Sequence, residues 1–150
     1  MKCPYCSYAE TKVTDKRDSD EVGITRRRRE CLKCEKRFTT YERVENLDLV
    51  VVKKDGRREQ FDRKKLLTGI HKACEKRPVS TEDIEKKVDE IEAEVRKLEG
   101  KEISSKEIGE LVMRKLKGLD KVAYIRFASV YKEFDDLETF KKELEKLVRK

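Results

Sequence analysis

The stretch "ITRRRRECLKC", residues 24–34, decides how the first third of the chain folds. It joins four consecutive arginines to a C-x-x-C pair, and an earlier C-x-x-C pair lies in "CPYC", residues 3–6. Each pair can form a tight turn that directs two thiolates inward, and two such turns complete the tetrahedral coordination that zinc prefers. Because all four ligands come from the protein, we predict a structural zinc site formed by Cys3, Cys6, Cys31 and Cys34.

A redox pair is the alternative interpretation of a C-x-x-C motif, but redox motifs usually occur singly and in a βαβ setting. A segment of about 45 residues has too little core to fold unaided, so metal binding would drive its folding. Strand-like runs occur at 11–17, 23–31 and 37–44, with a turn at 18–23. Together with the cysteine turns, these runs predict a zinc ribbon.

The four arginines lie on a strand that Cys31 tethers to the zinc site. Side chains alternate along a strand, so Arg26 and Arg28 share one face and Arg27 and Arg29 the other. One pair would reach base edges, and the other would hold phosphates or pack its stems on the ribbon. The planar fork of arginine favours nucleic acid over a merely solvated run of charge. The predicted DNA-binding residues are Lys16, Arg17, Arg26, Arg27, Arg28, Arg29 and Arg37.

Composition sets broader limits on the protein. The 150 residues are 36% hydrophobic and 47% charged, which allows one domain or two small ones with a modest core. The net charge of +7 is weak evidence for nucleic acid, because residues 1–46 carry only +3 of it. No apolar run is long enough to cross a membrane, and residues 1–10 contain no signal-peptide core. We expect a cytoplasmic protein with no membrane partner.

The second region begins with "LDLVVVKKDGRREQFD", residues 47–62, in which two strand-like runs flank the turn pair Asp55-Gly56. Lysines and arginines on both sides of this turn would suit a polyphosphate. From composition alone, an exposed turn rich in charge is the simpler interpretation.

Five amphipathic helices are predicted after this hairpin. Asp62 caps the first, Ser80 begins the second, Ser104 or Ser105 begins the third, Asp120 opens the fourth, and the last starts near Leu137. Gly100 and Gly118 are expected to end the second and third helices. The apolar stripes, which include Leu98, Val130, Leu144 and Val148, are predicted to form the core. No Walker A loop, dinucleotide fingerprint, nucleophile elbow or metalloprotease helix is present, so we predict no enzymatic activity.

Five stretches of the chain stand out: "CPYC", "TRRRREC", "RFTTYE", "CEKRPVS" and "DKVAYIRFASVYKEF". They resemble the bacterial NrdR family, whose members are transcriptional repressors of ribonucleotide reductase genes. The resemblance runs in order from residue 1 to about residue 135. It implies an α+β chain in which a zinc ribbon precedes an ATP-cone, a four-helix module covered by a β-hairpin or small sheet. The expected divisions are a ribbon at 1–45, a linker at 46–48, an ATP-cone at 49–136 and a C-terminal helix at 137–150.

The family's nucleotide pattern, V-x-K-R-D-G followed by E and K, falls on residues of the hairpin and the first helix. By this resemblance, Lys53, Lys54 and Lys65 would bind a triphosphate, and Gly56 would let the turn approach it. Lysine replaces the usual arginine at position 54 and keeps the charge without the bidentate fork. The remaining implied contacts are Val51 on the base, Glu59 on the ribose or adenine, and Tyr124 and Tyr131 facing the same pocket.

The resemblance also implies a mechanism, in which ATP and dATP favour homo-oligomers of different size and the oligomer sets how ribbons meet double-stranded operator DNA. Zinc would be the structural cofactor, one per chain, and the protein would associate with the nucleoid. Two alternatives remain at this point. One is an enzyme that uses the ATP-cone, such as a reductase fragment or a nucleotide hydrolase. The other is a ribbon-based scaffold for RNA or for the transcription machinery.

Overall fold

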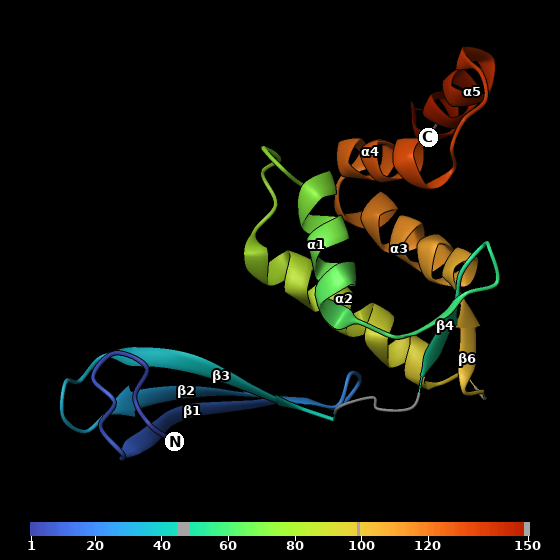
Figure 1. The fold of residues 1–150 in the computed structure, drawn as a ribbon. Coiled ribbons are helices and arrows are strands. Elements are labelled where there is room, and N and C mark those ends of the chain that lie inside the picture. The colour runs from blue at the N-terminus through green and yellow to red at the C-terminus, as the bar shows by residue number, and fades with distance from the viewer. Residues whose placement is uncertain (45–48, 99, 149–150) are drawn as a thin grey trace. The chain divides into compact units, whose positions relative to one another are not determined.

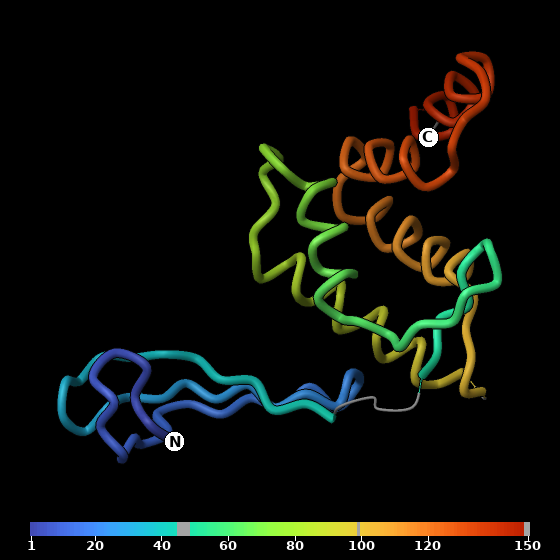
Figure 2. The backbone as a smooth tube through the Cα atoms, in the orientation of Figure 1, coloured from blue at the N-terminus to red at the C-terminus, as the bar shows by residue number. Residues whose placement is uncertain are grey.

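The computed structural model describes residues 1–44, 49–98 and 100–148. The chain forms two compact units, Met1–Glu45 and Asn46–Lys150, each with its own sheet (Figures 1 and 2). The linker predicted at 46–48 lies outside the described residues. The fold is α+β, as predicted, with small sheets in both units and helices in the second.

The first unit is a three-stranded antiparallel sheet with the order β1-β2-β3 (Figure 1). Its strands are β1 (Thr11–Ser19), β2 (Ile24–Cys31) and β3 (Arg37–Arg43). A bulge between Val13 and Asp15 shifts the register of β1. Gly23, with φ +63°, adopts the left-handed conformation that closes the turn between β1 and β2. The three predicted strands are confirmed, and β1 extends two residues beyond the predicted 11–17.

The second unit begins with the predicted hairpin, formed by β4 (Val50–Val52) and β5 (Arg58–Gln60). A third strand, β6 (Glu102–Ser104), pairs in parallel with β4 (Figure 1). The sheet order is β5-β4-β6. Sequence analysis missed β6 because three residues between two helices are too few to show an alternating pattern.

Helices make up the rest of this unit, and the first four begin at the predicted N-caps. The helices are α1 (Arg63–Ala73), α2 (Thr81–Arg96), α3 (Ser105–Leu119), α4 (Lys121–Tyr131) and α5 (Leu137–Val148). Asp62, Ser80 and Asp120 each accept a backbone N–H at a helix start, and Ser104 forms a full capping box with Glu107. Side chains with almost no exposure fill the core, among them Ile70, Val88, Ile91, Val112 and Leu116.

Two predicted helix ends and four predicted core residues are wrong. Two of these core residues are on α5, where Leu144 is 37% exposed and Val148 is 79% exposed. Helix α2 ends at Arg96, before Gly100, and Leu98 is 49% exposed. Helix α3 continues through Gly118 to Leu119, because the extended backbone of Asp120 ends it and starts α4. Val130 is 78% exposed, since the buried side of α4 is centred on other residues, including Tyr124 and Ala128.

Helix α5 contacts α4, and a buried carboxylate of α5 contributes to this contact. Glu143 is only 6% exposed, and it accepts a hydrogen bond from the Tyr124 hydroxyl on α4. The ammonium groups of Lys132 and Lys146 lie 3.0 and 3.3 Å from its oxygens. Burial alone would raise the pKa of Glu143, but the Tyr124 hydroxyl and the two lysines outweigh it and hold this pKa at about 2.

None of the helices in the described parts of the chain has the length and apolar character that a bilayer crossing requires.

Candidate functional site

The four predicted zinc ligands converge beside the end of β2. Their sulfur atoms all lie within 4.8 Å of one another, and the Cys3–Cys34 and Cys6–Cys31 pairs are each separated by 3.6 Å. A zinc tetrahedron with Zn–S bonds of about 2.3 Å has edges of about 3.8 Å. The cluster therefore has the size and the ligand chemistry of a structural Cys₄ zinc site.

Two backbone turns of the same shape direct these sulfurs inward. The amide of Ser7 donates to the carbonyl of Cys3 at 2.9 Å, and the amide of Glu35 donates to the carbonyl of Cys31 at 3.1 Å. Ser7 and Glu35 have φ of 59° and 55°, so each turn is closed by a left-handed residue. Neither residue is a glycine, which explains why the sequence carried no signal of this conformation.

Backbone amides also stabilise the negative charge of these thiolates. The amide of Cys34 donates to Cys31 Sγ at 3.4 Å, and the amide of Lys33 donates to the same sulfur at 3.3 Å. These bonds, the Cys34 amide first, lower the pKa of Cys31 to about 6. These amide contacts favour the thiolate form of Cys31, which is the form that binds zinc.

The four arginines occupy β2, the central strand of the ribbon, and all are half-buried. Their side chains alternate between the two faces of the sheet, in line with the register of β2 against β1 and β3. Each contacts polar groups on the outer strands: Arg26 lies 3.9 Å from Asp15, Arg27 pairs with Glu42, Arg28 donates to Thr39 and Arg29 donates to Thr40. The other predicted DNA-binding residues are exposed on β1 (Lys16, Arg17) and β3 (Arg37).

The second unit contains a cavity of about 200 Å³, lined by residues of the hairpin, α1, α3 and α4. Five of the eight predicted nucleotide-binding residues line it: Val51, Lys53, Glu59, Lys65 and Tyr131. Apolar side chains make up much of the remaining wall, including Phe61, Leu66, Ile108 and Phe127. The cavity therefore combines a largely apolar interior with lysines on one side, as a nucleotide's base and phosphates require.

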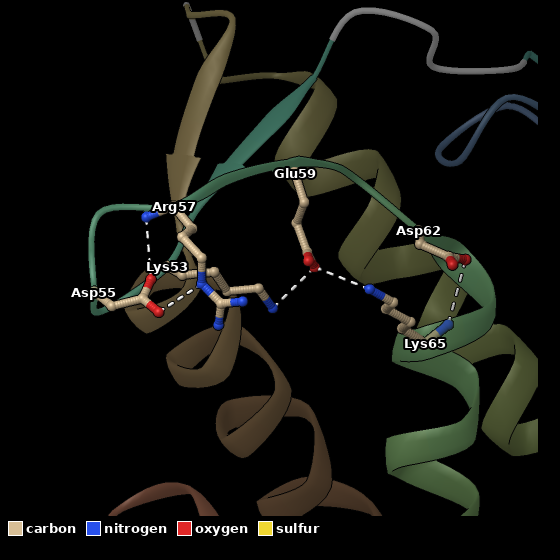
Figure 3. Close-up of polar contacts among 6 residues, drawn as sticks. All are labelled: Lys53, Asp55, Arg57, Glu59, Asp62 and Lys65. Carbon is tan, nitrogen blue, oxygen red and sulfur yellow. Dashed lines mark hydrogen bonds and ion pairs between the residues drawn. The ribbon is translucent and has the colours of Figure 1, made fainter.

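The two lysines converge on a single carboxylate (Figure 3). The ammonium groups of Lys53 and Lys65 lie 2.9 and 3.2 Å from Glu59 Oε1. The hydrogen bonds from Lys53 and Lys65 lower the pKa of Glu59, so it is ionised at neutral pH. Lys65 is in the first turn of α1, and the Asp62 side chain accepts from its backbone amide at 3.4 Å. An incoming phosphate would thus find two ammonium groups already placed on the same side of the cavity.

An aromatic wall lies across the cavity and depends on a glycine. The rings of Phe127 and Tyr131 are stacked, with centroids 5.8 Å apart and an interplanar angle of 19°. The Tyr131 hydroxyl donates to the carbonyl of Lys106 at 2.7 Å. A Cβ at Gly109 would lie 2.0 Å from Tyr131 Cε2, so only glycine leaves room for this ring. Sequence analysis missed Phe127 and Gly109; the one available signal was a glycine in the middle of a helix.

Two further predicted residues belong to the hairpin turn and do not line the cavity. Gly56 has φ +83° and closes the turn by donating its amide to the carbonyl of Lys53 at 3.0 Å. Lys54 is exposed, and its ammonium lies 3.3 Å from Glu133 Oε2. Beside them Arg57 forms an ion pair with Asp55 (Figure 3), in which Arg57 Nε lies 2.6 Å from Asp55 Oδ2.

The expectation that Tyr124 faces the same pocket as Tyr131 is wrong. Tyr124 is buried against α5, where its hydroxyl donates to Glu143, and it is not among the residues that line the cavity. Seven residues bring two side chains to the same side of a helix, but they also separate them by about 10 Å along the axis. Of the two tyrosines, only Tyr131 is at the end of α4 that reaches the cavity.

A larger open hollow of about 440 Å³ lies between α2 and α3. Among the described residues that line it are three carboxylates, Glu94, Glu107 and Glu110, and one basic residue, Arg114. The excess of negative charge makes this hollow a poor site for a triphosphate. The cavity beneath the hairpin is therefore the better candidate for a nucleotide.

Comparison with known proteins gives matches along the whole chain. Residues 1–42 match the family model "Transcriptional repressor NrdR-like, N-terminal domain", and residues 49–137 match the model "ATP cone domain". The two matched regions correspond to the two compact units of the structure.

Curated relatives are similar over nearly their full length. A protein named "Transcriptional repressor NrdR" from Acetivibrio thermocellus is 60% identical over 148 residues, which cover 99% of this chain and 98% of that protein. Proteins with the same name from Caldicellulosiruptor saccharolyticus and Petrotoga mobilis are 60% and 61% identical, covering 99% and 93% of this chain and 97% and 93% of their own. The role in these names is regulatory and not enzymatic. The chain belongs to the NrdR family of transcriptional repressors, and it combines the family's zinc ribbon with an ATP-cone.

Proposed function

We propose that this protein is a zinc-dependent repressor that binds operators upstream of ribonucleotide reductase genes and is controlled by ATP and dATP. The observation that carries the proposal is the presence, in one chain, of a Cys₄ ribbon with an arginine strand and a cavity with paired lysines. The ribbon would supply contacts to duplex DNA, and the cavity would supply the response to nucleotide.

Each part of the cavity has a role in this proposal. Lys53 and Lys65 bind the phosphates, and Lys54 adds a third cation from the hairpin turn. Val51 and Tyr131 bound the space for the adenine. Glu59 holds both lysines before the nucleotide arrives, and it then becomes available to the ribose.

Control by nucleotide requires a difference in affinity between two states of the protein. ATP and dATP differ by one hydroxyl, and a ligand that binds two oligomers equally shifts neither. We propose that each nucleotide stabilises a different homo-oligomer and that the dATP-loaded form represses. Repression by dATP would close a feedback loop on deoxynucleotide supply in the cytoplasm.

The test measures fluorescence anisotropy of a labelled duplex from upstream of the host's reductase genes. Zinc-loaded protein is titrated with ATP alone and then with dATP present, beside a scrambled duplex of equal length. Light scattering on the same samples reports the oligomer. We expect operator binding that is tight and specific with dATP and that changes together with oligomer size. Equal binding to both duplexes under every nucleotide condition would refute the regulatory proposal.

A further inference from the structure

The two faces of the ribbon sheet differ in how their charges are paired. Residues directly opposite each other in an antiparallel pair project on the same face, so the register of β1, β2 and β3 assigns every side chain. We call the face that carries Arg26 and Arg28 the even face, and the face that carries Arg27 and Arg29 the odd face.

On the even face, cations outnumber carboxylates. Its charged residues in the described strands are Lys12, Arg17, Arg26, Arg28, Arg37 and Arg43 against Asp15 and Glu30. Each of these carboxylates is shared between two cations. Asp15 lies 3.1 Å from Arg17 and 3.9 Å from Arg26. Glu30 lies 2.8 Å from Lys12 and 2.7 Å from Arg37.

Pairing on the odd face is closer to one carboxylate for each cation. Arg27 pairs with Glu42, and Lys16 lies 2.8 Å from Asp18. The hydrogen bonds from Lys16 and Thr25 lower the pKa of Asp18, so its negative charge persists at neutral pH. In the described strands this face carries three cations, Lys16, Arg27 and Arg29, against two carboxylates, Asp18 and Glu42. Its surplus of positive charge is therefore smaller than that of the even face, and a phosphate is attracted to it less.

We infer, on the basis of the proposed function, that duplex DNA docks on the even face and that Arg17, Arg26 and Arg28 make the principal contacts. The odd face then faces away from the duplex. A polyanion gains most where positive charge exceeds negative charge, and the planar guanidinium fork matches the geometry of phosphates and of the edge of guanine.

The arrangement across the strands supports this docking. Arg26 is opposite Arg17 on β1 and opposite Tyr41 on β3, so these three residues form one row across the even face. The side chain of Arg17 is 74% exposed, and Tyr41 is 43% exposed. Two arginines and a tyrosine are therefore neighbours on this face, and the side chains of all three can donate hydrogen bonds to phosphate or base acceptors.

The structure offers a matched pair of arginines for the test. Arg28 on the even face donates to Thr39 at 2.9 Å, and Arg29 on the odd face donates to Thr40 at 3.3 Å. Replacing either with alanine removes one positive charge and a hydrogen bond to a threonine of β3, and Arg29→Ala also removes a hydrogen bond of 3.4 Å to Thr11 on β1. Long-range attraction falls equally in both variants, so a difference between them reports direct contact.

The experiment measures anisotropy of Arg28→Ala and Arg29→Ala on operator duplex over a series of salt concentrations. Zinc content and circular dichroism check that the ribbon folds in both variants. We expect Arg28→Ala to weaken binding at least about tenfold and to reduce the slope of log K against log salt by about one. Arg29→Ala is expected to weaken binding less than about threefold. An equal or greater loss in Arg29→Ala would overturn the assignment of faces.

The two arginine variants test the choice of face independently of the proposed repressor function. At low salt a basic ribbon also binds scrambled duplex through phosphates alone, so the two variants are compared there as well. Wild-type protein that binds operator and scrambled duplex equally would refute specific repression, and the variants would still decide between the two faces. Wild-type protein that binds no duplex at all would overturn both proposals.

Discussion

The ring of Tyr131 occupies the space that a side chain at Gly109 would fill. A Cβ at Gly109 would lie 2.0 Å from Tyr131 Cε2, far inside van der Waals contact. Because Tyr131 lines the cavity and stacks on Phe127, the absence of a side chain on α3 sets the shape of the candidate nucleotide site.

Gly109→Ala is expected to displace Tyr131 and to impair nucleotide binding. Overpacking of a buried contact costs about 1–3 kcal/mol, so the melting temperature should fall as well. Isothermal titration with ATP and dATP measures the loss of affinity, and thermal unfolding measures the change in stability.

Gly118→Ala is the control for this substitution. Gly118 lies on the same helix, is exposed, and has no atom within 4 Å of the position of a Cβ. Alanine there should stabilise the helix by about 0.5–1 kcal/mol and leave nucleotide affinity unchanged. If Gly109→Ala binds nucleotide as tightly as Gly118→Ala, the Tyr131 wall is not part of the site.

Lys65→Ala is expected to weaken nucleotide binding by about tenfold or more, because a charge-assisted hydrogen bond to phosphate contributes about 1.5–3 kcal/mol. Its neighbour Lys64 is exposed and does not line the cavity, so Lys64→Ala removes the same charge without the contact. Titration of both variants with ATP tests the assignment. Comparable losses in the two variants would show that general positive charge, and not the cavity, attracts the nucleotide.

Local signals in the sequence were sufficient for much of this structure. The spacing of Cys3, Cys6, Cys31 and Cys34 predicted the ligand cluster, and the N-caps at Asp62, Ser80 and Asp120 were correct. These features depend on neighbours within a few residues, which a single sequence displays directly.

Features that depend on contacts between distant segments could not be predicted in this way. Strand β6 exists because β4 offers a parallel edge about 50 residues away, as the pairing of Val51 with Ile103 shows. Tyr124 and Tyr131 looked equivalent on a helical wheel, and only the docking of α5 separates their surroundings. Gly118 was expected to end α3 because glycine often terminates helices, but the cap at Asp120 determines where α3 stops.

Cys31→Ala is expected to abolish zinc binding and, with it, DNA binding. Loss of one of four ligands leaves the ribbon without the metal that would drive its folding. The ATP-cone forms its own compact unit, so nucleotide affinity should survive. Zinc content by mass spectrometry, DNA anisotropy and nucleotide titration measure the three properties separately.

Cys74→Ala is the matched control for the zinc ligand. Cys74 is buried in the core of the second unit, and the four-cysteine cluster does not include it. This variant should retain one zinc ion per chain and bind DNA normally. A zinc-free Cys74→Ala protein, or a Cys31→Ala protein that keeps its zinc, would contradict the assigned ligand set.

Glu143 should make the attachment of α5 sensitive to acid. Its pKa in the folded protein is about 2, below its ordinary value of 4.5, so its contribution to stability is present above pH 4.5 and is lost as pH falls toward 2. Glu143→Gln should lower the free energy of unfolding by about 1–3 kcal/mol at pH 7. The difference between wild type and Glu143→Gln should shrink between pH 4.5 and 2, which urea unfolding at several pH values measures. Glu145→Gln, a substitution of an exposed residue on the same helix, should have the same free energy of unfolding as wild type at every pH. A constant difference between wild type and Glu143→Gln across this pH range would mean that the charge of Glu143 does not hold α5 on α4.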